Sequence, residues 1–120
     1  TKTLIEMVNN AVNASKGNVV CIEKGDKLIH DITYKARLID TDAYSITDAE
    51  ALYGFIAGIL ASNSDITDIF VDSALKIIGN NNESFENMLV KLEKITAEVN
   101  LVMTASIAVD ECPEGIKAYA

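Results

Sequence analysis

The chain has 120 residues, of which 49% are hydrophobic and 23% are charged. This length and this balance predict one folded domain with a real core, and they exclude a disordered chain. The formal net charge of −8 disfavours binding to nucleic acid or to an anionic membrane. The only basic cluster, Lys35-Ala36-Arg37, is more typical of a solvated strand edge or helix end.

The two cysteines do not form a disulfide framework or a metal site with Cys-x-x-Cys spacing. Cys21 lies in an apolar run and is predicted to be buried and inert. Cys112 lies among acidic residues, which disfavour a thiolate. The sequence shows neither a secretory signal nor an apolar run of about 18 residues, so we expect a cytoplasmic protein that does not enter the membrane.

The first half of the chain begins with a predicted amphipathic helix over residues 2–16, which stops at Gly17. Residues 18–23 form an apolar run without alternation, which is typical of a strand covered on both faces of a parallel sheet. Residues 26–34 fit either a short helix capped by Asp26 or one side of a hairpin, and we favour the helix. A second short strand is predicted over residues 36–40.

A polar loop at residues 41–45 leads to the strongest local signal, the capping box Thr47-Asp48-Ala49-Glu50. It predicts a helix that continues to about Ser62. Gly54, Gly58 and Ser62 share one face of this helix, and each interior glycine costs about 1 kcal/mol relative to alanine. We expect a close approach of the helix backbone to the sheet or to another helix to offset this cost.

The second half of the chain continues the alternation of strands and helices. The predicted elements are a buried strand at residues 68–72, a helical turn or two at 73–78 stopped by Gly79, a helix at 83–98 capped by the asparagines at 80–82, a strand at 101–109 and a last short strand at 116–120. In the helix at 83–98, we expect the inward side chains to be Phe85, Met88, Leu89, Leu92 and Ile95.

This order of elements predicts an α/β fold in a single domain over residues 1–120. The expected architecture is a three-layer α/β/α sandwich with a mostly parallel sheet of four to five strands, joined by right-handed crossovers. The last strand is expected to pair antiparallel at an edge.

The order of elements, together with the run Ile69-Phe70-Val71-Asp72, resembles a small RecA-type P-loop ATPase core over roughly residues 18–109. The run is similar to the apolar strand and acid of a Walker B site. The resemblance implies nucleotide binding at Gly25 and its neighbours, with magnesium held near Asp72.

The loop at residues 23–30, EKGDKLIH, lacks the pattern that this family needs. A Walker A loop, G-x-x-x-x-G-K-[ST], uses glycines to expose backbone N–H groups to phosphates and a lysine to neutralise them. Here there is one glycine, Asp26 stands where the family has lysine, and no serine or threonine follows. An aspartate at a helix N-terminus takes the place that a phosphate would have. We therefore interpret the loop as a structural turn and expect no ATP hydrolysis.

Three acidic residues, Asp40, Asp42 and Asp72, lie at or just beyond the carboxyl ends of predicted strands, where open α/β sheets bind ligands. In the alternative interpretation, Asp40 and Asp42 are turn residues and Asp72 caps the following helix. His30, the single histidine, has no nucleophile near it in the sequence.

Two functions follow from these residues. The first is a non-catalytic domain related to P-loop ATPases that acts through a protein partner or by self-association, without a cofactor or a bound metal. The second is a small-molecule or nucleotide binder, with Lys24, Gly25, Lys27, Asp40, Asp42 and Asp72 near the ligand. We prefer the first, because Lys24 and Lys27 are more typical of solvated lysines. An enzyme that uses His30 or paired carboxylates ranks last, because no catalytic site can be assembled.

Overall fold

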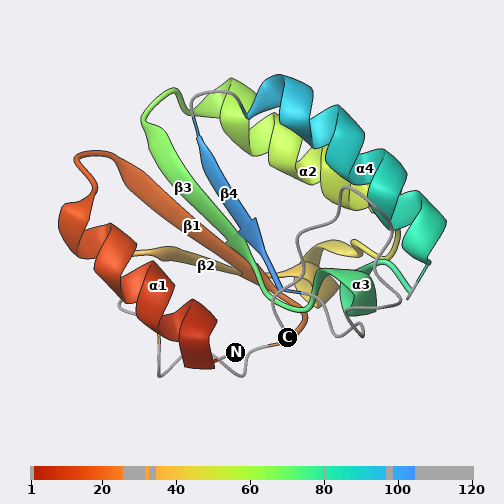
Figure 1. Ribbon diagram of the computed structural model, residues 1–120, viewed down its shortest axis with the longest axis horizontal. Coiled ribbons are helices and arrows are strands. Elements are labelled where there is room, and N and C mark those ends of the chain that lie inside the picture. The colour runs from red at the N-terminus through yellow and green to blue at the C-terminus, as the bar shows by residue number, and fades with distance from the viewer. Residues whose placement is uncertain (1, 26–31, 33–34, 80, 97–98, 105–120) are drawn as a thin grey trace.

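The computed structural model describes residues 2–25, 32, 35–79, 81–96 and 99–104 (Figure 1). In this part of the chain, four parallel strands form one sheet in the order β2-β1-β3-β4. The strands are β1 (Asn18–Glu23), β2 (Arg37–Asp40), β3 (Ile66–Val71) and β4 (Asn100–Met103). The predicted parallel sheet is thereby confirmed.

Helices cover both faces of the sheet. α1 (Lys2–Ala14) lies on one face, and α2 (Ala49–Ser62) and α4 (Asn82–Ile95) lie side by side on the other (Figure 1). A short helix, α3 (Ala74–Ile77), follows β3, and a 3-10 helix, η1 (Thr41–Tyr44), follows β2. This arrangement is the predicted three-layer α/β/α sandwich.

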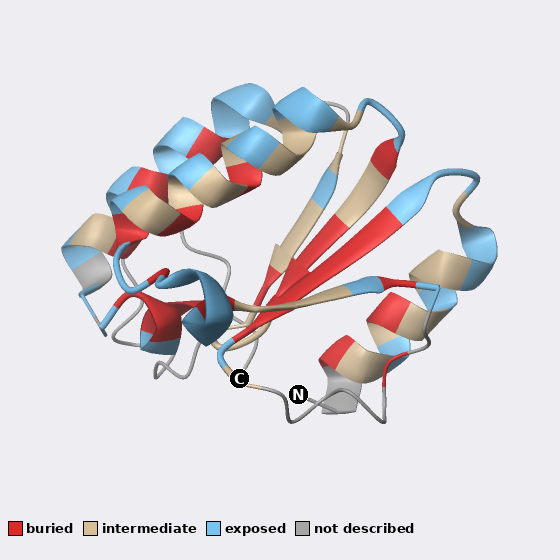
Figure 2. Ribbon diagram, turned by 180° about the vertical axis from the view of Figure 1, so that it is seen from behind, coloured by how far each residue is buried: buried red, intermediate tan, exposed pale blue. Residues whose placement is uncertain are grey.

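The central strands β1 and β3 are largely buried (Figure 2), with helices on both faces of the sheet. Val19 and Cys21 of β1 pack in the cluster beneath α1, whereas Val20 and Ile22 pack in the larger cluster beneath α2 and α4. All four side chains are buried. The absence of alternation in the β1 sequence therefore indicated its position correctly.

Gly17 is explained by lack of space and not by a helix stop. α1 ends at Ala14, and a Cβ on Gly17 would lie 2.0 Å from the main-chain oxygen of Asp65. The same oxygen accepts a hydrogen bond from the N–H of Asn18 at 2.8 Å. Glycine therefore lets the start of β1 lie against the loop that precedes β3.

The capping box is shifted by one residue from the prediction. Asp48, and not Thr47, is the N-cap of α2, and its side chain accepts a hydrogen bond from the N–H of Ala51 at 2.7 Å. Both residue types are good caps, so the sequence did not distinguish the two starting points.

The expected close approach at Gly54 and Gly58 is wrong. Both glycines are exposed, and no atom lies within 4 Å of the position that a Cβ would take at either. The buried face of α2 is formed by Ala49, Leu52 and Ile56 instead. The glycine face points to solvent and has no packing that offsets its cost in helix stability.

Three smaller differences concern element ends. Residues 41–45, predicted as a loop, contain η1. α4 ends at Ile95, which is 37% exposed and not inward. β4 covers only the first part of the predicted strand at 101–109, and residues 105–109 lie outside the described residues.

The predicted roles of Asn81 and Gly79 at helix ends agree with the structure. Asn81 caps α4 as expected, with its side chain accepting from the N–H of Ser84. Gly79 has a φ of 79°, consistent with its predicted role after α3. The choice between helix and hairpin for residues 26–34 and the strand at 116–120 fall outside the described residues, apart from buried Ile32. None of the helices described is both long enough and apolar enough to cross a membrane.

Candidate functional site

The strand order places a switch point at the centre of the sheet. β2 lies on one side of β1, and the chain then crosses to β3 on the other side. In open α/β sheets, ligands bind beyond the carboxyl ends of the strands at such a reversal. At this edge, the ends of β1, β2 and β3 carry Glu23, Asp40 and Asp72.

Four of the predicted ligand residues come together at the end of β1 and β2. Asp40 Oδ1 accepts hydrogen bonds from the N–H of Gly25 at 2.8 Å and from the N–H of Asp42 at 2.9 Å. Lys24 Nζ donates to Asp42 Oδ1 at 2.7 Å, and both side chains are about half exposed. Gly25 has a φ of 96°, which glycine adopts without strain. Each of these residues is therefore bonded to another member of the group.

This bonding uses the groups that a phosphate would need. The N–H of Gly25 points to Asp40, so it is not presented to an anion. The Lys24–Asp42 pair is exposed and contributes only about 0–1 kcal/mol, but it places a carboxylate beside the lysine. The geometry matches the interpretation of Asp40 and Asp42 as turn residues.

Asp72 lies apart from this group. Its Oδ1 accepts a hydrogen bond at 3.0 Å from Thr104 Oγ1, which in turn accepts the N–H of Ser73 at 2.8 Å. β1 separates Asp40 from Asp72, so their Cα atoms lie about 10 Å apart, given a strand spacing of about 4.8 Å. The predicted ligand set is thus divided into two, and Lys27 lies outside the described residues.

The alternative prediction that Asp72 caps the next helix is wrong. The N-cap position of α3 is Ser73, which has a φ of 54° and makes no side-chain cap bond. Asp72 instead bonds to Thr104 and so links the carboxyl ends of β3 and β4. Its partner, Thr104, was not identified from the sequence, because nothing in the local pattern links residues 72 and 104.

Burial and two neighbouring carboxylates both raise the pKa of the Cys21 thiol. Burial of the thiol, followed by the negative charges of Glu23 and Asp72, raises the pKa of Cys21 from 9.0 to about 12. The prediction that Cys21 is buried is confirmed, and a thiol with this pKa is protonated at neutral pH. Glu23 is also buried, at 2% exposure, although the sequence analysis treated it only as the end of a strand.

Acidic side chains alone do not make a metal site at this edge. Among the described residues, no three or more His, Cys, Asp or Glu side chains are grouped so that they could hold a metal ion.

A hollow of about 550 Å³ runs along the outer edge of β2. We call it the β2-edge hollow. Its lining includes Asn18, residues 35–40, Ala43 and Tyr44. Tyr44 is 60% exposed, and its ring stacks on that of Phe55 with a centroid distance of 5.9 Å. Nothing in the local sequence pattern predicts this hollow or the position of β2 at the edge of the sheet.

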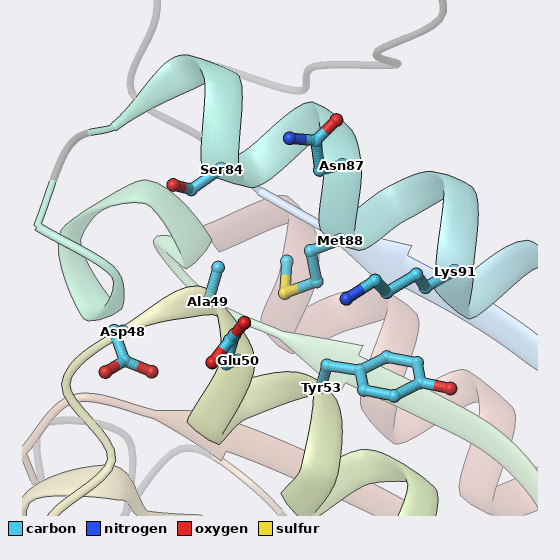
Figure 3. Close-up of a pocket in the computed structure, with 8 residues that line it drawn as sticks. All are labelled: Asp48, Ala49, Glu50, Tyr53, Ser84, Asn87, Met88 and Lys91. Carbon is cyan, nitrogen blue, oxygen red and sulfur yellow. The ribbon is translucent and has the colours of Figure 1, made fainter.

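A second hollow, of about 340 Å³, lies between α2 and α4 (Figure 3). Asp48, Glu50 and Tyr53 line it from α2 and its cap, and Ser84, Asn87 and Lys91 line it from α4. Lys91 Nζ lies 5.7 Å from the centroid of the Tyr53 ring. Charges of both signs therefore border this hollow, which we call the α2–α4 groove.

Comparisons of the chain with models of protein families, with curated proteins and with solved structures found no match. The geometry described above is therefore the basis for a functional conclusion.

Proposed function

We propose that this chain is a non-catalytic α/β domain, related to P-loop ATPases but without a competent phosphate loop, that acts by binding protein. The observation that carries the proposal is the bonding at the ends of β1 and β2. The N–H of Gly25 donates to Asp40, and Lys24 pairs with Asp42. A protein-binding role also agrees with the β2-edge hollow, because an edge strand offers a surface to another chain.

The first test is thermal unfolding of the full chain with a panel of nucleotides, with and without magnesium. A ligand at about 100 times its dissociation constant adds about 2.7 kcal/mol to the free energy of unfolding, which shifts the midpoint by several degrees. We expect no shift with any nucleotide. A magnesium-dependent shift with ATP or ADP would overturn the proposal.

Sedimentation velocity from micromolar to submillimolar concentration distinguishes the two ways of binding protein. A mass that rises with concentration supports self-association. A monomer over the whole range excludes self-association and requires a different protein as partner.

A second candidate function is binding of a small molecule at the switch point between β1 and β3. The observation that favours it is that Glu23 ends β1 and Asp72 directly follows β3, on neighbouring parallel strands. Two carboxylates favour a cationic ligand over a phosphate. In thermal unfolding with small amines, stabilisation that is lost in Asp72→Asn would favour this candidate over the first.

A further inference from the structure

Within the described part of the chain, the outer side of β2 is an open sheet edge. Among these residues β2 is hydrogen-bonded to β1 on one side only, and it is the first strand in the sheet order β2-β1-β3-β4. Alternate residues of an edge strand direct their N–H and C=O groups outward, where they can pair with an added strand. All four residues of β2 line the β2-edge hollow, which has a volume of about 550 Å³.

The side chains along the hollow fit a peptide with apolar residues at alternate positions. Leu38 packs towards the α1 side of the sheet and Ile39 towards the α2 side, and both are only partly buried. At the end of the strand, Tyr44 is 60% exposed and stacks on Phe55. An added strand would therefore meet apolar surface on each of its faces.

Arg37, at the start of β2, gives this end of the hollow a positive charge that favours an acidic residue in the partner. Arg37 is exposed, and its guanidinium forms no ion pair with the described residues. A carboxylate beside it would gain a charge-assisted hydrogen bond. The net charge of −8 repels a strongly acidic partner, so one acidic residue at this position fits better than a run of them.

In a twofold pairing of two β2 edges, the carboxylate of Asp40 does not reach Arg37 of the second copy. Two copies of β2 related by a twofold axis would pair antiparallel, and side chains that face each other would lie on the same face of the joined sheet. Arg37 and Asp40 are three positions apart on β2, so they lie on opposite faces and cannot meet across the axis. Two chains of the same net charge also repel each other.

We propose that the outer edge of β2 binds an extended segment of another protein as an added strand, with apolar side chains at alternate positions and one acidic residue beside Arg37. This inference rests on the proposed protein-binding function and assigns it a surface and a class of partner. Binding of an extended peptide to a sheet edge combines main-chain hydrogen bonds, which give affinity, with side-chain contacts, which give specificity.

The test begins with selection of short random peptides displayed on phage against the full chain, followed by synthesis of the selected peptides with a fluorescent label. Fluorescence polarisation then gives dissociation constants for the unchanged protein, for Arg37→Glu and for the control Lys94→Glu. Lys94 is an exposed cation on α4, remote from β2. Circular dichroism checks that both variants are folded.

We expect Arg37→Glu to weaken binding by about fivefold to tenfold and Lys94→Glu to leave it unchanged. Replacing the acidic residue of the peptide by lysine should restore binding to Arg37→Glu. N-methylation of the peptide backbone should abolish binding at alternate positions only, because only alternate N–H groups of an added strand face β2.

Each other outcome contradicts the inference in a different way. Selected peptides that bind equally well to Arg37→Glu, and tolerate every N-methylation, would leave the protein-binding function standing and overturn its assignment to β2. Loss of binding in Lys91→Glu would then move the surface to the α2–α4 groove. If no peptide is selected, the added-strand inference fails, and the nucleotide panel and sedimentation decide the function separately.

Discussion

The thiol of Cys21 is fully buried in β1, and it links the stability of the fold to pH. Its pKa rises from 9.0 to about 12 in the folded state. Above pH 9 the unfolded chain loses this proton while the folded chain keeps it, so folding stability from this group is complete below pH 9 and decreases from there to about pH 12. The loss approaches about 1.4 kcal/mol per pH unit.

We expect Cys21→Ala to remove this part of the pH dependence. Urea unfolding between pH 8 and about pH 10.5 would measure it, with both proteins carrying Cys112→Ser so that Cys21 is the thiol that titrates. Other groups, such as lysines and tyrosines, contribute equally to both proteins. Parallel stability curves for the two proteins would show that Cys21 ionises as easily in the folded state as in the unfolded state.

Thr41 is a second buried residue with a measurable cost. Its side chain is fully buried at the start of η1, and its Oγ1 has no hydrogen-bond partner among the residues that the structure describes. A buried hydroxyl without a partner costs about 1–3 kcal/mol. We therefore expect Thr41→Val, which keeps the shape of the side chain, to raise the free energy of unfolding by about 1 kcal/mol in chemical denaturation.

Thr67→Val is the matched control. Thr67 Oγ1 donates to Asp68 Oδ1 at 2.7 Å, so the same substitution should lower stability there. A decrease for Thr41→Val as well would mean that the Thr41 hydroxyl has a hydrogen-bond partner in solution.

Among the elements, α2 contains two interior glycines that lower its helix stability. Gly54 and Gly58 lie on its solvent face with open space where a Cβ would be. We expect Gly54→Ala and Gly58→Ala each to add up to about 1 kcal/mol, seen as a higher thermal midpoint. Gly17→Ala is the contrasting variant and should destabilise, because its Cβ would collide with the oxygen of Asp65. A destabilised Gly58→Ala would reveal a contact on the exposed face of α2.

The elements themselves were largely predictable, because strands buried on both faces read as continuous apolar runs and helices read as periodic ones. The strand predicted at residues 18–23 is β1, and the buried strand predicted at residues 68–72 is β3, which begins two residues earlier and ends at Val71. The misses have local causes. Ile95 lies in the last turn of α4, where the helical period continues but the neighbouring core ends.

The site was less predictable than the elements, because its contacts join distant parts of the chain. Asp40 bonds to Gly25, and Asp72 bonds to Thr104, and both pairings depend on strand order. Sequence periodicity indicates that a strand is buried, but it does not indicate which strand is its neighbour. The open edge at β2 could not be identified for the same reason.

The whole molecule has two unequal cores, one on each face of the sheet. The smaller one joins α1 to the sheet through Leu4 and Val8, both fully buried, and the larger one lies beneath α2 and α4. Substituting a buried leucine by alanine costs about 2–5 kcal/mol. We expect Leu4→Ala to release α1 while the sheet stays folded, because the described residues of α1 pack on the smaller core and the larger core still holds the sheet.

Native-state hydrogen exchange would measure this difference. In Leu4→Ala, amides of α1 should lose much more protection than amides of β3, whereas Leu52→Ala in the larger core should lower both together. Equal losses in Leu4→Ala would show that the two cores unfold as one cooperative unit.

The contacts of Thr104 also bear on when the fold can be completed during synthesis. The N–H of Ser73 and that of Ala74 donate to Oγ1 and the main-chain oxygen of Thr104, and the N–H of Thr104 donates to Val71. Before residue 104 has left the ribosome, the N–H groups of Ser73 and Ala74 lack these partners, although β3 can already pair with β1. We therefore expect the turn after β3 to become fully bonded only when β4 has joined the sheet, late in translation.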